Sequence, residues 1–157
     1  MEGLVLMAVI TAVLVVVAQV RRRPPAVQEH DVPGIGMFRY DTDTHSWRTT
    51  VQSAAGPIGF LVAGSERPDS GLLETARTVL ASSESFMAAV QEYLRREADR
   101  GGALAEESQA LRLEEVCLFW PNRPKDGMLY FKGSDPERRV WRCDWLNGIP
   151  QPLGYDA

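Results

Sequence analysis

Three possible metal ligands are the most regularly spaced reactive side chains in the sequence. Asp41, Asp43 and His45 alternate through the stretch DTDTH. A calcium loop of the EF-hand type that began at Asp41 would need glycine at its sixth position and glutamate at its twelfth. Ser46 and Gln52 occupy those positions, so the pattern fails. We therefore expect a polar hairpin turn, and a weaker metal site on the same three side chains stays open as an alternative.

Cys117 and Cys143 are the two cysteines of the chain. A catalytic thiol needs a histidine partner, and the two histidines of the sequence, His30 and His45, fall in a predicted linker and a predicted turn. We therefore expect two buried core thiols in a reducing compartment, where disulfides are rare. The carboxylates show no spacing that selects an acid–base pair, and the sequence has no glycine-rich phosphate loop. No catalytic residue and no cofactor are predicted.

The last third of the sequence is rich in aromatic side chains, and arginines interleave with them. Core packing accounts for most of these rings. Trp, Tyr and Arg are also concentrated in the hot spots of protein interfaces, and arginine stacks on aromatic rings. We therefore expect a partner-binding surface that consists of Arg139, Trp141, Arg142, Trp145 and Tyr155.

Six strands and one helical stretch are expected to position these side chains. Between residues 72 and 94, apolar residues recur every three or four positions, which is typical of an amphipathic helix lying on a sheet. The run SSES at 82–85 interrupts this pattern with residues that favour helix N-caps, so one or two helices are expected. Alternation of apolar and polar residues predicts strands over 38–40, 47–51, 58–62, 111–120, 128–132 and 139–146.

This order of elements predicts an α+β fold. Short turns between successive strands favour antiparallel pairing, and one helical layer covers one face of the sheet. We therefore expect a two-layer domain with an antiparallel sheet of about six strands, in the order βββ-α(α)-βββ.

Short motifs at the two ends of this predicted domain enclose its helical middle, namely MFRYD at the start and WRCDWLNGIPQPLGYD at the end. Over residues 36–157, the chain resembles small bacterial domains that are known as families of unknown function. In those families, a glycine-proline turn is followed by a terminal Leu-Gly-Tyr/Phe-Asp motif. The resemblance implies the same α+β fold and supplies no catalytic residue. Some domains of this general sort are immunity proteins beside bacterial toxins, which implies toxin inhibition as an alternative function.

The N-terminal stretch Gly3–Val20 contains 18 residues without a charge or a proline. As a helix it would be roughly 27 Å long, close to the roughly 30 Å of the hydrocarbon core of a bilayer. Arg21, Arg22 and Arg23 follow at once, and cations beside a membrane span stay on the cytoplasmic side. We therefore expect a single membrane anchor with the N-terminus outside and the C-terminal domain in the cytoplasm. A cleaved signal peptide and a buried soluble helix stay open as alternatives.

The predicted organisation is an anchor over residues 1–23, a stiff proline-containing linker over 24–35 and a globular domain over 36–157. The whole chain has a net charge of −4. Removal of residues 1–23 removes Glu2 and three arginines, which leaves 14 basic and 20 acidic residues and a net charge of −6. Nucleic acid is therefore excluded as an expected partner, because its recognition needs a basic face.

Together these patterns predict a membrane-anchored, cytoplasm-facing module that binds a protein partner and has no catalysis of its own. The partners expected are the membrane, through the Gly3–Val20 helix, and a protein. The alternatives are a small membrane-tethered hydrolase or metal-dependent enzyme, and an immunity-type inhibitor of a bacterial toxin.

Overall fold

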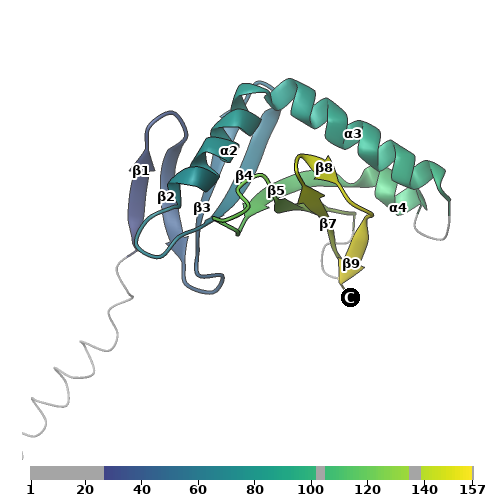
Figure 1. The fold of residues 1–157 in the computed structure, drawn as a ribbon. Helices are drawn as coiled ribbons and strands as arrows, with labels where there is room; N and C mark the ends of the chain where they lie inside the picture. Colours follow the sequence, from purple (N-terminus) through teal and green to yellow (C-terminus); the bar gives the residue numbers. More distant parts are fainter. Residues whose placement is uncertain (1–26, 102–104, 135–138, 157) are drawn as a thin grey trace, which may run out of the picture.

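The computed structural model describes residues 27–101, 105–134 and 139–156. These residues form one sheet with helices on one of its faces (Figure 1). The strands lie in the order β1-β2-β3-β4-β5-β6-β7, and both β8 and β9 pair with β7. In chain order the elements are β1 (Glu29–Val32), β2 (Gly36–Asp41), β3 (Ser46–Ser53), β4 (Gly56–Ala63), α2 (Ser70–Ala81), α3 (Ser83–Asp99), α4 (Ala105–Ala110), β5 (Arg112–Leu118), β6 (Gly127–Lys132), β7 (Val140–Leu146), β8 (Ile149–Pro150) and β9 (Gly154–Asp156).

The first four strands form an antiparallel meander. At the β3–β4 turn, the Ser53 hydroxyl donates to the carbonyl oxygen of Gly56 at 2.7 Å, and Gly56 has a φ of 109°, which favours glycine. β1 lies inside the segment 24–35 that the sequence analysis assigned to a linker. The ordered sheet therefore begins at Glu29 rather than near residue 36.

A helical crossover joins the two halves of the sheet. Asp69 caps α2 by accepting the backbone N–H of Leu72 at 3.1 Å. The helical stretch divides at Ser82, where α2 ends and α3 begins, so the division expected near 82–85 is confirmed. After α4 the chain enters β5, which pairs with β4 in parallel. The helical crossover brings the chain back beside β4 in the same direction, so the two strands pair in parallel. The prediction of a purely antiparallel sheet was therefore wrong.

The core lies between the helices and one face of the sheet. Side chains from both halves of the sheet meet the buried faces of α2 and α3 there. The alternation predicted for the last long strand is confirmed, since β7 turns Trp141, Cys143 and Trp145 into this layer. The largest fully buried side chains are Trp47, Phe38, Phe60, Ile58, Leu72, Leu111, Leu118 and Leu129.

The chain after β7 returns along the same strand and forms the edge of the sheet. Asn147 and Gly148 make the turn, and the backbone N–H of Gln151 donates to the carbonyl oxygen of Asp144 at 2.7 Å. β9 then pairs residues 154–156 with residues 140–142. Prolines in this tail suit an edge position, because proline cannot donate to a further strand.

The sheet has nine strands, not the six predicted. The three additional strands are β1, β8 and β9, which are four, two and three residues long. β8 and β9 are too short to show an alternating pattern, which needs about four to eight residues. β1 just reaches that length, but prolines and a glycine surround it and favour a linker. Each of them lies at a sheet edge, where short strands are usual.

The predicted membrane anchor must also be corrected. Within residues 27–101, 105–134 and 139–156, no helix is long and apolar enough to cross a bilayer. The longest of these helices, α3, has 17 residues and carries charged side chains through its second half, which a hydrocarbon core disfavours. Gly3–Val20 and the three arginines after it lie outside the described residues. The anchor, the outside N-terminus and the cytoplasmic position of the domain are therefore not supported.

Candidate functional site

The turn between β2 and β3 uses Asp41 for structure. One carboxylate oxygen, Oδ1, accepts the backbone N–H groups of Asp43 at 2.9 Å and Thr44 at 3.4 Å. The other, Oδ2, lies 3.1 Å from Arg48 Nη1. The hydrogen bond from Asp43, helped by Thr44 and Arg48, holds the pKa of Asp41 below its ordinary value. His45 completes the turn in the left-handed region, with a φ of 51°.

The three residues predicted as possible metal ligands thus form the polar hairpin turn that the sequence indicated. Asp43 and His45 are exposed, and both oxygens of the Asp41 carboxylate already have partners. Within the described ranges, no group of three or more His, Cys, Asp or Glu side chains is close enough to hold a metal ion. The metal-dependent enzyme therefore has no support from these side chains.

Both cysteines are buried free thiols, as the sequence predicted. Burial raises the pKa of Cys117 in β5 far above its ordinary value. Burial also raises the pKa of Cys143 in β7, to about 11. Because the thiolate is the reactive form, neither side chain is a nucleophile at neutral pH. His30 packs edge to face against Trp47 instead, with ring centroids 6.0 Å apart.

The five residues predicted as a partner surface do not share one face. Trp141 is 3% exposed and Trp145 is 7% exposed, because both point from β7 into the core. Trp145 packs edge to face against Phe86 of α3, with ring centroids 5.8 Å apart. Arg142 lies on the opposite face of β7, and its Nε is 2.9 Å from Asp156 Oδ2. One continuous surface of all five residues is therefore not formed.

Arg139, Trp141 and Tyr155 do come together, around Glu107 of α4. The Tyr155 ring lies against the Trp141 ring, with centroids 5.2 Å apart. The Arg139 guanidinium lies 5.1 Å from the centroid of Tyr155, which is a cation–π contact. Glu107 accepts the indole N–H of Trp141 at 3.0 Å and forms an ion pair with Arg139. The rings and the arginine were predicted from the sequence, whereas the glutamate that joins them was not.

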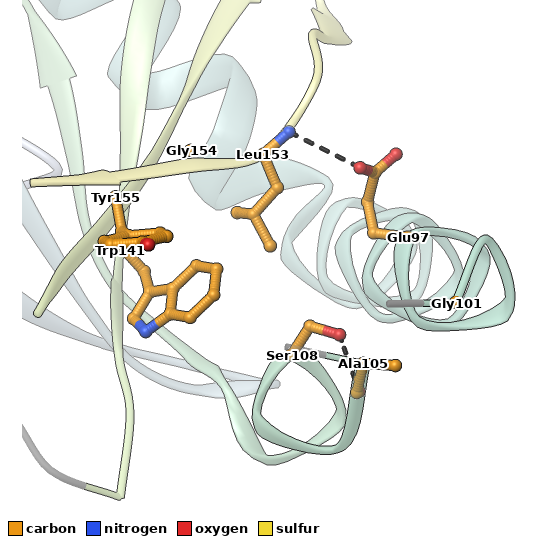
Figure 2. Close-up of a pocket in the computed structure, with 8 residues that line it drawn as sticks. All are labelled: Glu97, Gly101, Ala105, Ser108, Trp141, Leu153, Gly154 and Tyr155. Carbon is orange, nitrogen blue, oxygen red and sulfur yellow. Dashed lines mark hydrogen bonds between the residues drawn. The ribbon is translucent and has the colours of Figure 1, made fainter. Parts of the chain in front are cut away.

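These rings border a groove of about 400 Å³ between the helices and the C-terminal tail (Figure 2). Leu153 reaches into the groove from the tail, and Glu97 of α3 lies across from it (Figure 2). The Glu97 Oε2 atom accepts the backbone N–H of Leu153 at 3.5 Å, which ties the tail to the helix. We call this hollow the C-terminal groove, and it is lined by Glu97, Gly101, Ala105, Ser108, Trp141, Leu153, Gly154 and Tyr155.

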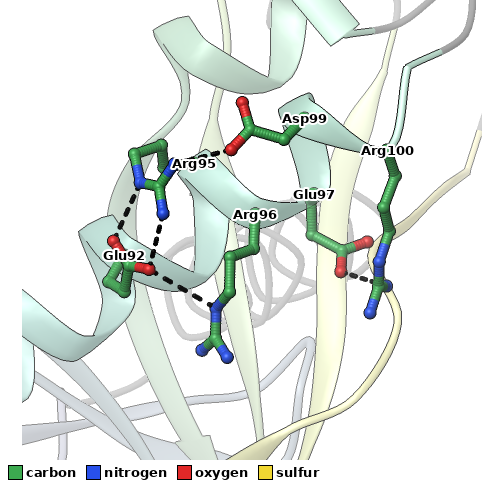
Figure 3. Close-up of polar contacts among 6 residues, drawn as sticks. All are labelled: Glu92, Arg95, Arg96, Glu97, Asp99 and Arg100. Carbon is green, nitrogen blue, oxygen red and sulfur yellow. Dashed lines mark hydrogen bonds and ion pairs between the residues drawn. The ribbon is translucent and has the colours of Figure 1, made fainter.

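Glu97 differs from the other charged residues of α3. Arg95 pairs with Glu92 and Asp99 along the outer side of the helix, where all three side chains are well exposed (Figure 3). Exposed pairs of this kind contribute little to stability, because solvent and salt screen the two charges. Glu97 pairs with Arg100, but its own side chain is only 13% exposed, since it faces the tail. It is the one charged residue that lines the C-terminal groove in the described part of the chain.

Comparison with known proteins gives no match: no protein-family model, no curated protein and no solved structure is similar to this chain. The resemblance to bacterial families of unknown function therefore stays a prediction. The function has to be argued from the geometry of the domain.

Proposed function

We propose that this domain is a non-catalytic module that binds a protein partner, and that the partner docks in the C-terminal groove. The observation that carries the proposal is the composition of the groove, which combines apolar walls with one carboxylate and an accessible ring. Tyr155 is 42% exposed, and Leu153 and Trp141 lie beside it. Aromatic side chains in such positions are enriched among the residues that dominate binding energy at protein interfaces.

The charge of the domain favours a basic partner. Residues 24–157 have a net charge of −6, and the charged residue in the described lining of the groove is Glu97, which pairs with Arg100. Complementary charge speeds the encounter of two proteins and sets which partners are accepted. The contact between Arg139 and Tyr155 also demonstrates that this ring accepts a guanidinium on its face. A partner that inserts an arginine or lysine beside an apolar residue fits these features.

The reactive side chains of the described residues show no arrangement that points to catalysis. Within the described residues, both thiols are buried and protonated, and no metal-binding cluster is present. No observation favours the hydrolase alternative. An immunity-type inhibitor would be one form of the proposed module, and it stays a prediction.

Site-specific photo-crosslinking in cells tests this proposal. A crosslinking amino acid at Tyr155 is expected to capture a defined protein, whereas the same amino acid at Gln52, exposed on β3, is expected not to capture it. The captured protein is then purified and its affinity measured. Tyr155→Ala is expected to weaken binding about tenfold or more, and Gln52→Ala to leave it unchanged. Equal capture at both positions, or equal affinity of both variants, would contradict the proposal.

A further inference from the structure

A second hollow lies where the α2–α3 junction faces the β7–β8 turn. It has a volume of about 230 Å³, which is below the range usual for drug-sized ligands and suits a ligand with a single ring. We call it the α2–β7 slot. Its lining consists of Thr75, Thr78, Val79, Ser82, Phe86, Lys125, Trp145, Asn147 and Gly148.

The slot is held open by contacts between its walls and their surroundings. The Thr75 hydroxyl donates to the carbonyl oxygen of Pro124 at 2.7 Å, which fixes the 121–126 loop against α2. On the other side, the buried Asp126 carboxylate accepts the backbone N–H of Asn147 at 2.9 Å. Asn147 and Gly148 both have left-handed backbones, with φ of 50° and 81°, as a tight two-residue hairpin turn requires. The two walls are therefore positioned before any ligand arrives.

The inner surface of the slot is apolar. Val79 from α2 is buried, and Phe86 from α3 meets Trp145 edge to face. Trp145 is 7% exposed and Phe86 is half-buried, and both rings line the slot, so part of each ring faces the hollow. An aromatic or aliphatic group of modest size is thus complementary to this surface.

Trp145 differs from the other two buried tryptophans in the state of its indole N–H. The indole of Trp47 donates to the carbonyl oxygen of Gly64 at 3.1 Å, and that of Trp141 donates to Glu107 at 3.0 Å. Among the described residues, the indole N–H of Trp145 has no hydrogen-bond acceptor, although more than nine-tenths of this residue is buried. No buried side-chain nitrogen or oxygen of the described residues is without a partner, so this N–H still reaches solvent. It can therefore donate to a ligand in the slot in place of water.

The other polar groups of the slot also favour an acceptor. The Lys125 ammonium has no ion pair with another described residue, and the side-chain amide of Asn147 has no described hydrogen-bond partner. No aspartate or glutamate lines the slot, even though residues 24–157 carry a net charge of −6. The nearby Asp126 carboxylate is outside the lining and is already engaged, by the Asn147 backbone N–H and by Arg123 at 3.6 Å. The lysine, the amide and the indole N–H of the lining are complementary to an anion.

We propose that the α2–β7 slot binds a small aromatic monocarboxylate. The ring of the ligand packs against Phe86 and Trp145, and its carboxylate accepts hydrogen bonds from Lys125, Asn147 and the Trp145 indole. This site is separate from the C-terminal groove and does not depend on a protein partner. A neutral analogue lacks the charge that Lys125 recognises, and a nucleotide is too large for the volume.

The test is a titration of the full-length protein with 3-phenylpropionate, followed by NMR through the tryptophan indole N–H signals. A saturable shift of the Trp145 signal is expected with the carboxylate. 3-Phenyl-1-propanol, which has no charge, is expected to bind at least about tenfold more weakly. Lys125→Gln is expected to weaken binding of the carboxylate about tenfold, because a charged hydrogen bond is lost. Lys132→Gln, at an exposed lysine of β6 outside the slot, is the matched control and leaves binding unchanged.

Three results would overturn the proposal. The first is the absence of a saturable Trp145 shift, and the second is equal affinity for the carboxylate and the alcohol. The third is equal behaviour of Lys125→Gln and Lys132→Gln. Because both lysines are exposed, neither substitution is expected to affect folding, so each result bears on the slot itself.

Discussion

The C-terminal groove and the α2–β7 slot lie along the same strand but have opposite chemical character. The inner face of β7 supplies Trp141 to the C-terminal groove and Trp145 to the α2–β7 slot, with Cys143 between them. In the groove, Glu107 accepts the tryptophan N–H. In the slot, that N–H has no described acceptor, and the charged residue is a lysine. β7 therefore determines the position of each tryptophan ring, whereas the surrounding helices and loops determine which ligand that ring can bind.

The largest difference that this comparison predicts concerns stability. Trp145→Ala is expected to lower the free energy of unfolding by about 3–5 kcal/mol, since a buried ring is lost and a cavity remains. Tyr155→Ala, at the mostly open ring of the groove, is expected to cost about 1 kcal/mol. Urea denaturation of both variants measures the contrast. Equal losses would mean that Tyr155 belongs to the core rather than to a binding surface.

The second prediction concerns Glu107, which accepts the Trp141 N–H beside the C-terminal groove. Glu107→Ala removes the acceptor of the Trp141 N–H and the partner of Arg139, and is expected to cost about 2 kcal/mol. Glu106→Ala, at the exposed neighbour on the same helix, provides the control and is expected to change stability by less than about 0.5 kcal/mol. A similar loss in both variants would assign the effect to α4 rather than to the contact with Trp141.

A smaller effect is expected at the turn that forms one wall of the slot. Asn147→Ala places a side chain that disfavours the left-handed region at a φ of 50°, which is expected to cost about 1–2 kcal/mol. Asn147→Gly tolerates this backbone and keeps the N–H that Asp126 accepts, so it is expected to be nearly as stable as the natural protein. Thermal unfolding distinguishes the two. If glycine were as harmful as alanine, the side-chain amide and not the backbone would be holding the turn.

The smallest effect, absent at neutral pH, concerns the thiol between the two hollows. Burial raises the pKa of Cys143 from its ordinary value of 9.0 to about 11, so its contribution to stability is complete below pH 9 and is lost as the pH rises toward 11. The unfolding free energy is therefore expected to fall over this range, and less steeply in Cys143→Ala. The measurement is urea denaturation at several pH values. Identical slopes for the two proteins would show that the thiol is accessible to solvent.

The features that the sequence predicted correctly are local ones. Alternation identified the inner face of β7, and turn-forming residues marked the hairpin at Asp41 and the division of the helical stretch at Ser82. The parallel pairing of β4 with β5 was missed, because it depends on the path of the crossover rather than on a pattern within either strand. β8 and β9 were missed because they contain too few residues to alternate, and β1 because prolines and a glycine surround it.

The predicted binding surface was only partly correct for a related reason. Aromatic and arginine content drew attention to residues 139–155, but Glu107 lies 34 positions before Trp141 in the chain and carries no motif. Lys125 is likewise an ordinary residue of a polar loop, and only the fold brings it beside Trp145, which lies 20 positions later in the chain. Sequence composition thus located the aromatic strand. The polar side chain that lies beside each tryptophan, Glu107 or Lys125, comes from a distant segment and could not be predicted from composition.

The most direct test of this account compares two probes of opposite charge in one NMR experiment on the full-length protein. One probe is 3-phenylpropionate and the other is 3-phenylpropylammonium, and the signals followed are the indole N–H groups of Trp141 and Trp145. The account predicts that the carboxylate shifts Trp145 and the ammonium shifts Trp141, because the slot has Lys125 and the groove has Glu97. If both probes shifted the same indole, or if the ammonium were preferred at Trp145, the assignment of opposite binding preferences to the two hollows would be wrong.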